Sequence, residues 1–226
     1  MLEGLATRWR GAVQETISDG LESGRNPLEV ASHLAGRVNL QTGQREGALI
    51  IFDEADKEIV FRFREVLTTL DQSYFQYDLR DKRFDRSVQR AILNREPITE
   101  QKIVLLVYRF EAKLLKRKAD LIARTEMLAS MHRSEWLSIK SSMERNNLPE
   151  ESLTRIWKTC CKDDVRPSHK ALHGTRIIGL ERCFISPVTG ARMMYPGDRS
   201  LGASEGEVEG CRCRIQYETD FLYGVT

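Results

Sequence analysis

The longest hydrophobic pattern in the chain is helical and spans residues 99–146. Its apolar residues recur at steps of three, four and seven, which places them on one stripe of a helix: Ile103, Val107, Phe110, Leu114, Leu121 and Leu128. No proline or glycine interrupts the stretch. The pattern therefore predicts one very long helix, or a long helix broken once. Because such a helix is unusual in a compact domain, we expect an elongated bundle or an arm that lies on a partner.

A shorter helix is predicted between residues 26 and 36. Asn26 is suited to cap it, Pro27 to its first position, and Glu29 to the acidic position of a capping box. Gly36 is a typical C-terminal stop. The stretch 40–49, "LQTGQREGAL", is rich in turn residues and is predicted to be a loop.

Two more helices are predicted before the long one. Between residues 53 and 70 the apolar side chains share one helical face: Ile59, Phe63, Val66, Leu67 and Leu70. Asp53 is a suitable cap for this helix. Asp85 opens a second helix that ends before Pro97, and Thr99 can cap the helix that follows. Most of the first 150 residues is therefore predicted to be helical.

The composition changes after "NNLPEESL", where glycine and proline become frequent. One further helix is predicted over about 149–161, with these residues on its apolar face: Leu153, Ile156, Trp157 and Cys160. The later segments "TRIIGLERCFI", "ARMMY" and "RCRIQYE" have strand character, with "SPVTG" as a hairpin turn. We therefore expect a mostly α chain. An elongated helical part with the long helix (1–148) precedes a small α+β C-terminal domain (149–226).

The composition is that of a globular chain of balanced charge. At 41% hydrophobic and 30% charged residues, the 226-residue chain can bury a core in one large or two small domains. Its 35 basic and 33 acidic residues give a net charge of +2, which argues against a protein that coats DNA but leaves a local basic face open. No apolar run reaches membrane-spanning length, and "MLEGLATRWR" lacks the apolar core of a signal peptide. We expect a cytosolic protein, in which five cysteines do not form a disulfide scaffold.

Two histidines and two cysteines form a candidate zinc ligand set. His169 and His173 are four residues apart, so on a helix they would share a face. Cys211 and Cys213 are two residues apart, so on a strand both sulfurs would point to one side. Such pairs can complete a tetrahedral zinc site, and a metal would help a small domain with little core. Asp163 is a further carboxylate that could complete the shell.

The same residues also admit a structural interpretation without metal. Zinc knuckles usually have two to four residues between their cysteines, whereas this pair has one. Pro167 leaves room for only a short helix under the histidines, and buried free cysteine is a common core residue. A disulfide within the Cys-x-Cys pair would be strained. The three remaining cysteines are expected to lie in the core: Cys160, Cys161 and Cys183.

Other reaction signatures are weak. The chain has no Walker-type phosphate loop, no dinucleotide glycine fingerprint and no nucleophile elbow. The doublet Asp163–Asp164 could bind a cation but is also typical of a solvated helix end. A basic run could contact phosphate or form a solvated helix face: Lys113, Lys116, Arg117 and Lys118. Arg124 and Glu126 face different ways on a helix, and each is expected to pair with a neighbouring helix.

Four short motifs occur in an order that resembles the Mu protein F-like head morphogenesis family, the minor head proteins of tailed phages. They are "RKADLIARTEMLAS", "DDVRPSHKALHG", "YPGD" and "GCRC". The resemblance covers roughly residues 36–217. The family pattern falls on these positions: Arg124, Thr125, Glu126, Asp163, Arg166, His169, Gly174, Pro196, Gly197, Asp198, Cys211, Arg212 and Cys213. The chain departs from it at Gly210, where family members usually have asparagine.

The resemblance implies a non-enzymatic minor capsid protein. It would associate with the portal protein and the major capsid protein during head assembly, with a part in DNA packaging or ejection and contact with packaged DNA as further options. Its expected location is the capsid interior or portal vertex of the virion, and the host cytoplasm during assembly. No membrane and no small-molecule substrate are expected. The alternative is a small metal-dependent enzyme, such as a nuclease, in which the His/Cys cluster holds a metal with an open position.

Overall fold

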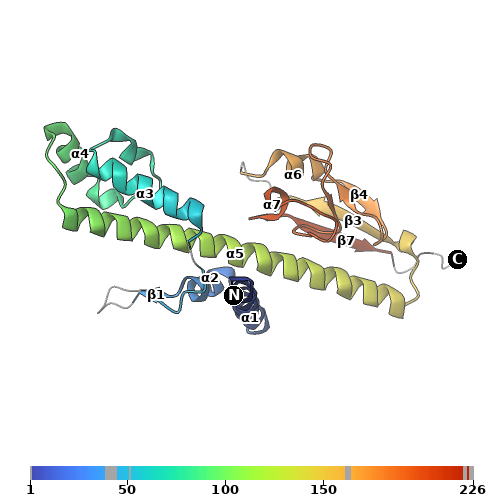
Figure 1. Ribbon diagram of the computed structural model, residues 1–226. Helices are drawn as coiled ribbons and strands as arrows, with labels where there is room; N and C mark the ends of the chain where they lie inside the picture. Colours follow the sequence, from blue (N-terminus) through green and yellow to red (C-terminus); the bar gives the residue numbers. More distant parts are fainter. Residues whose placement is uncertain (1, 39–44, 51, 161–163, 221–222, 224–226) are drawn as a thin grey trace. The chain divides into compact units, whose positions relative to one another are not determined.

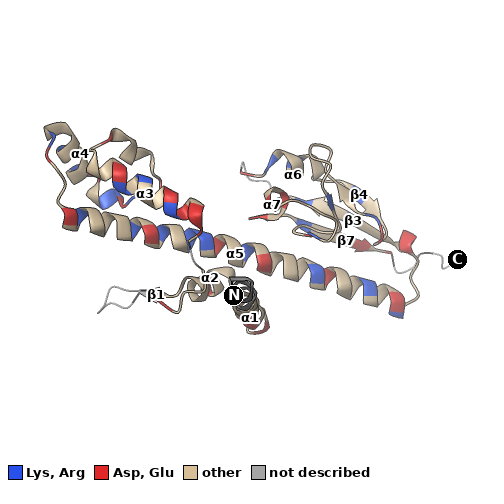
Figure 2. Cartoon of the chain, viewed as in Figure 1, with Lys and Arg blue, Asp and Glu red and all other residues tan. Residues whose placement is uncertain are grey.

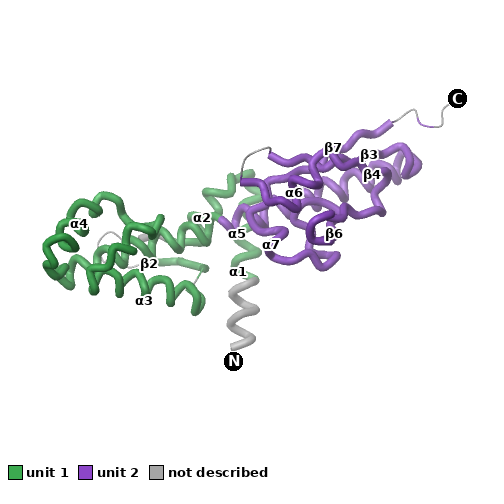
Figure 3. The backbone as a smooth tube through the Cα atoms, turned by 90° about the horizontal axis from the view of Figure 1, so that it is seen from above, with its two compact units in different colours: residues 1–120 green, residues 121–226 purple. Residues whose placement is uncertain are grey.

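The computed structural model describes residues 2–38, 45–50, 52–160, 164–220 and 223, and it is mostly helical with a small β region near the C-terminus (Figure 1). This arrangement confirms the predicted fold class. The chain divides into two compact units, unit 1 (1–120) and unit 2 (121–226), coloured separately in Figure 3. The division falls inside the long helix α5 (Glu100–Arg145) and not near residue 148, where the sequence placed it. The change of composition near residue 148 marks the end of α5 and not the boundary between the units. The second half of α5 packs with the C-terminal strands and therefore belongs to unit 2.

Unit 1 consists of short helices and the first half of α5. The elements before α5 are α1 (Leu2–Glu22), α2 (Pro27–Ala35), β1 (Arg37–Val38), β2 (Arg45–Glu46), α3 (Glu54–Thr68), η1 (Gln72–Gln76), η2 (Lys82–Phe84) and α4 (Asp85–Asn94). The predicted capping is confirmed, because the Asn26 side chain accepts from the N–H groups of Leu28 and Glu29 at 3.0 and 3.1 Å. The predicted loop over 40–49 is wrong in part. Its residues 45–46 form β2, which pairs antiparallel with β1, and residues 40–44 lie outside the described residues.

The core of unit 1 lies where α3, η1 and α4 meet the first half of α5. Its buried members are Phe63, Leu67, Tyr74, Val88, Ile103, Leu106, Val107 and Phe110. The rings of Phe63 and Phe110 stack with centroids 4.1 Å apart, which joins α3 to α5. The first four residues of the predicted apolar stripe, Ile103 to Leu114, therefore face this core, whereas Leu121 and Leu128 are half-buried residues of unit 2. The helix is continuous over 46 residues, which confirms the prediction of one very long helix over that of a long helix broken once.

A buried carboxylate in unit 1 joins η2 to α5. The side chain of Asp81 accepts two hydrogen bonds from the guanidinium of Arg83, at 2.9 and 2.7 Å, and one from Arg109, at 2.9 Å. It also caps η2 by accepting from the N–H of Arg83. The hydrogen bonds from Arg83 and then Arg109 hold the pKa of Asp81 well below its usual range. The ionised form is therefore the one that stabilises the folded chain.

We expect Asp81→Asn to lower the melting temperature at pH 7, and the gap from wild type to close under acid conditions. A carboxyl whose pKa is lowered on folding stabilises the protein above its unfolded pKa of about 4, and this contribution is lost as the pH falls below that value. Asparagine keeps the cap through one oxygen, but it loses the oxygen that accepts from Arg83 Nη2 and from Arg109, so the change removes the charge together with these two hydrogen bonds. Thermal melts between about pH 7 and 3 test this, with the exposed Asp78→Asn as control. A gap that stayed constant across this range would contradict the assigned charge.

Unit 2 packs the second half of α5 with two small antiparallel sheets. Its other elements are η3 (Glu150–Ser152), β3 (Leu153–Lys158), α6 (Pro167–Leu172), β4 (Arg176–Ile178), β5 (Phe184–Ile185), β6 (Arg192–Met193), α7 (Glu205–Val208) and β7 (Arg214–Thr219). The strand order of the larger sheet is β4-β3-β7, with Trp157 opposite Ile215. The hairpin of β5 and β6 confirms the predicted turn at "SPVTG". Met143 of α5 packs with Leu153 and Leu180 in one buried cluster.

The predicted helix over 149–161 is wrong, because this segment forms the central strand β3. Leu153, Ile156 and Trp157 fit helical spacing, but all three are buried in a strand that is covered on both faces. A strand buried on both faces loses the alternation of apolar and polar residues that identifies a half-exposed strand. β-Branched and aromatic residues in "LTRIWK" were the remaining signal for a strand.

Arg155 lies at the centre of unit 2 and is completely buried. Its guanidinium donates to the carbonyl oxygens of Gly179 at 2.7 Å, Met194 at 2.8 Å and Arg182. It also lies over the ring of Phe184, with 5.4 Å from Cζ to the ring centroid. One side chain therefore ties β3 to three separate loop positions.

Among the helices of the described residues, none is both long enough and apolar enough to cross a bilayer.

Candidate metal centre

His169, Cys211 and Cys213 meet in the interior of unit 2. Nδ1 of His169 lies 3.5 Å from Sγ of Cys211 and 3.4 Å from Sγ of Cys213, and the three ligand atoms all lie within 4.8 Å of one another. Zinc bonds of about 2.3 Å to sulfur and 2.0–2.1 Å to nitrogen, at tetrahedral angles, place S and N about 3.5 Å apart. The three side chains are buried. Donor types and spacing therefore fit a zinc ion.

Local sequence explains how each ligand reaches this point. Pro167 starts α6 and so places His169 in a short helix against Trp157, whose ring meets the imidazole edge-on at 5.3 Å. The cysteines lie in the extended segment just before β7, not within the strand as predicted. The exposed Arg212 separates the two buried cysteines, so the alternation of a strand is retained. Both sulfurs consequently lie on the side that faces His169.

A buried carboxylate contacts the other nitrogen of the same imidazole. Oε2 of Glu207, on α7, lies 3.1 Å from Nε2 of His169 and accepts a hydrogen bond from Oγ of Ser168 at 2.9 Å. Glu207 is only 5% exposed, and a carboxylate is rarely buried without a specific partner. Metal-binding histidines commonly direct their second nitrogen to a carboxylate, which orients the ring and fixes its tautomer. Here Nε2 lies close to the carboxylate but makes no hydrogen bond to it, so the contact places a negative charge beside the ring without fixing the tautomer, and Nδ1 is the nitrogen nearest the two sulfurs.

The pKa values of the two thiols shift in opposite directions. The hydrogen bond from Cys213, followed by the contact with His169, lowers the pKa of Cys211. The interaction with Cys211 and burial together raise the pKa of Cys213. The N–H of Cys213 also donates to Sγ of Cys211 at 3.5 Å. The geometry thus favours a thiolate at Cys211 before any cation binds, and a divalent metal would deprotonate the second thiol as well.

A small cavity of about 70 Å³ adjoins the three ligands and offers a fourth position. Cys160 and Asp164 line it and are the side chains there that could add a ligand. The Asp164 carboxylate lies 3.4 Å from the guanidinium of Arg212, and both side chains are exposed. A fourth protein ligand would close the shell, as in structural zinc sites, whereas a water molecule would leave it open, as in catalytic ones.

The structure brings together three of the four predicted ligands. His173 is not among them, because α6 ends at Leu172 and His173 leaves the helical face of His169. Nδ1 of His173 instead accepts from the N–H of Thr159 at 3.1 Å. Asp163 and Cys161 lie outside the described residues.

Two further cysteine predictions are corrected. Cys160 and Cys183 are half-buried rather than core residues, and the sulfur of Cys183 accepts from Nε of Arg192 at 3.5 Å. Among the cysteines that the structure describes, those of the core are Cys211 and Cys213, which are free thiols packed with Trp157.

Residues of the other motifs hold loops of unit 2 against α5. Oγ1 of Thr125 accepts from the N–H of Gly210 at 2.9 Å, directly before the cysteine pair. Glu126 pairs with Arg199 at 3.1 Å, so its partner lies on a loop and not on a neighbouring helix as expected. The carboxylate of Asp198 accepts from the N–H groups of Met194 and Ser200, each at 2.8 Å. Nδ1 of His132 lies 2.9 Å from the carbonyl oxygen of Pro196. Arg166 donates to the carbonyls of Gly206 and Glu209.

The predicted basic run on α5 is largely engaged within unit 1. Nζ of Lys118 bridges the carboxylates of Asp53 and Asp56, and Nζ of Lys113 donates to the carbonyl of Arg80 at 2.9 Å. Lys116 and Arg117 remain exposed. Figure 2 shows acidic and basic residues interspersed along α3 and α5. Lys118 and Lys113 therefore make contacts within unit 1, whereas Lys116 and Arg117 form an exposed helix face.

The sequence contained no spacing signal for Glu207, which follows His169 by more than thirty residues and acts through a contact made only in the fold. The assembled cluster can bind a thiophilic divalent cation and, through its open position, could present a bound water to a substrate. Comparisons of the chain with protein-family models, with curated proteins and with solved structures gave no match.

Proposed function

We propose that this chain is a minor capsid protein of a tailed phage, which associates with the portal vertex and the inner capsid during head assembly. The observation that carries the proposal is the convergence in unit 2 of motifs that lie far apart in the sequence. Thr125 on α5, Asp198 in a loop and the segment around Cys211 are more than ten residues from one another, yet each holds part of the same unit. This convergence supports the fold that the resemblance implies, and the capsid role itself is taken from the resemblance.

The departure at Gly210 falls on a position whose backbone suits glycine. Gly210 has φ +61°, a left-handed conformation that glycine adopts freely and asparagine more readily than most other residues. A Cβ at this position would lie 3.1 Å from Cδ1 of Leu121 on α5. Glycine in place of the family's asparagine therefore retains the backbone that carries the contact with Thr125. No role for an asparagine side chain is needed there.

In this role the metal would stabilise unit 2 rather than catalyse a reaction. The ligands come from α6 and from the segment before β7, so a bound ion would join two parts of a domain with short strands. The portal protein and the major capsid protein are the proposed partners. The virion is the proposed location of the assembled protein.

Mass spectrometry of purified phage heads tests the assembly proposal. We expect this chain in a few copies per head, co-purifying with the portal protein, and we expect it to be missing from heads made with a stop codon in its reading frame. A non-structural phage protein of similar abundance in the lysate serves as the control for carry-over. Heads that contain every other structural protein but none of this chain would overturn the proposal.

A metal-dependent nuclease is the second candidate, and the cavity of about 70 Å³ beside three ligands is the observation that favours it. A plasmid nicking assay with the zinc-, magnesium- or manganese-loaded protein separates the two. We expect no cleavage above that of His169→Ala. Metal-dependent cleavage that is lost in His169→Ala would establish the enzyme and reject a purely structural centre.

A further inference from the structure

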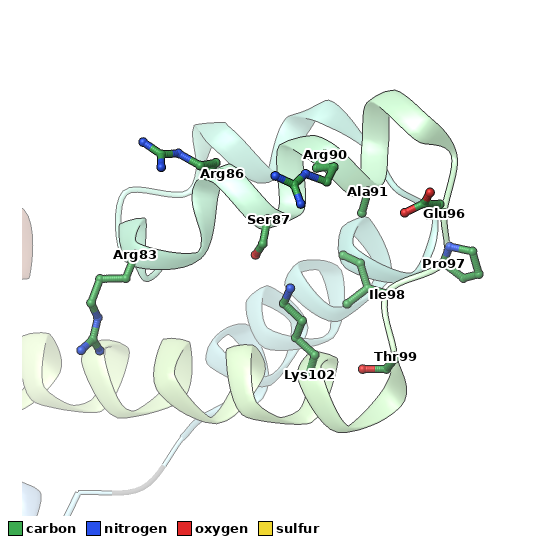
Figure 4. Close-up of a pocket in the computed structure, with 10 residues that line it drawn as sticks. All are labelled: Arg83, Arg86, Ser87, Arg90, Ala91, Glu96, Pro97, Ile98, Thr99 and Lys102. Atoms are coloured by element: carbon green, nitrogen blue, oxygen red, sulfur yellow. The ribbon is translucent and has the colours of Figure 1, made fainter.

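A cleft of about 470 Å³ in unit 1 lies between α4 and the start of α5. The polar residues that line it are four cations, two hydroxyl residues and one acid: Arg83, Arg86, Arg90 and Lys102, Ser87 and Thr99, and Glu96. Figure 4 shows Arg90 and Ser87 of α4 directed toward Lys102 of α5, whereas the guanidinium of Arg86 extends outward. Two cationic side chains from different helices therefore converge on one space, with a hydroxyl between them.

The cations of the cleft differ in whether a carboxylate already neutralises them. Arg83 is bonded twice to Asp81 and is fixed at the rim. In the described parts of the chain, no ion pair within 4.0 Å engages Arg86, Arg90 or Lys102. The acidic lining residue, Glu96, accepts from Nδ2 of Asn94 at 3.3 Å. The cleft therefore carries a net positive charge that the unit itself does not balance.

The start of α5 adds to this positive potential. The N–H groups of a first helical turn are partly unpaired, and the macrodipole places partial positive charge there. Thr99 and Lys102 line the cleft on either side of the first residue of α5, Glu100. The carboxylate of Glu100 is itself bonded to Arg64 of α3. The N-terminus of α5 and the cationic side chains thus both contribute positive potential, which would attract an anion into the cleft.

We propose that the α4–α5 cleft binds the phosphate backbone of a nucleic acid. Arginine and lysine with nearby hydroxyl groups are the usual donors to backbone phosphates. The residues that line the cleft include no aromatic side chain on which a nucleobase could stack, so binding through phosphate is independent of base sequence. The inference stands on the charges of unit 1 and does not depend on the proposed function.

Fluorescence anisotropy with a labelled duplex DNA of about 20 base pairs tests this. We expect binding at about 50 mM salt, with an affinity that falls steeply as salt rises. The double variant Arg90→Gln/Lys102→Gln should bind about tenfold more weakly and reduce the slope of log K against log salt by about 2, because two phosphate contacts are lost.

A charge-matched control separates the cleft from the overall charge. Arg25→Gln/Arg214→Gln removes the same charge from exposed positions outside both the cleft and the basic run of α5, and should keep the wild-type affinity within about twofold. Circular dichroism of both double variants checks that they are folded. Equal losses in the two variants, or no binding by the wild type, would overturn the proposal. So would binding of inorganic phosphate at the cleft without binding of duplex DNA, which would identify a site for small anions only.

Discussion

Replacing Cys211 or Cys213 by serine is expected to abolish zinc binding and to unfold unit 2 while unit 1 stays folded. The binding energy of a structural metal is folding energy, and serine is a much poorer zinc ligand than a thiolate. Elemental analysis of the purified variants measures the zinc content. Thermal melts followed by tryptophan fluorescence report mainly on unit 2, which holds Trp136 and Trp157. Far-UV circular dichroism follows the helices of unit 1.

Cys183→Ser is the matched control for this experiment. Cys183 belongs to the same unit but lies outside the cluster and is half-buried, so serine there should leave both the zinc content and the melting temperature near wild type. A metal-free wild type, with cluster variants that melt at a lower temperature but keep unit 2 folded, would reject the metal. The cysteines would then be ordinary core residues, for which serine costs about 1–3 kcal/mol.

Arg155→Met is expected to destabilise unit 2 by about 3–5 kcal/mol, the cost of leaving buried hydrogen-bonding partners unpaired. Methionine has a similar length and fills the space, so the effect comes from three carbonyl groups that lose their donor. Arg155→Lys should rescue little, because one ammonium group cannot reproduce the planar fork that reaches three separate loop positions. Denaturant unfolding followed by tryptophan fluorescence measures both.

Arg214→Met serves as the control, since Arg214 is exposed on β7 in the same sheet. A change within about 0.5 kcal/mol is expected there. A similarly small effect for Arg155→Met would mean that the carbonyls of Gly179 and Met194 find other donors, and that Arg155 does not hold the loops together.

Local signals explain why most helices were predictable and one strand was not. The Asn26 capping box and the uninterrupted apolar stripe of α5 are encoded within a few turns of chain, so they were read directly. β3 becomes a strand through pairing with β4 and β7, which are distant in sequence. Its burial on both faces is a property of unit 2 as a whole, and no pattern within six residues expresses it.

The candidate site was predictable to the extent that its ligands come in close pairs. The Cys-x-Cys spacing places both sulfurs on one side wherever the backbone is extended, so Cys211 and Cys213 were correctly paired with each other. The spacing of His169 and His173 requires a helix that contains both residues, and α6 ends at Leu172, directly before His173. Glu207 reaches His169 from another helix, and only the fold reveals that contact.

The most direct test of the metal centre is zinc X-ray absorption spectroscopy on the wild-type protein purified with zinc. The expected result is one zinc ion per chain with at least two sulfur neighbours at about 2.3 Å and at least one nitrogen at about 2.0–2.1 Å. His169→Ala should lose a nitrogen neighbour and keep the sulfurs. Zinc bound without sulfur neighbours, or no bound zinc at all, would contradict a centre built from His169, Cys211 and Cys213.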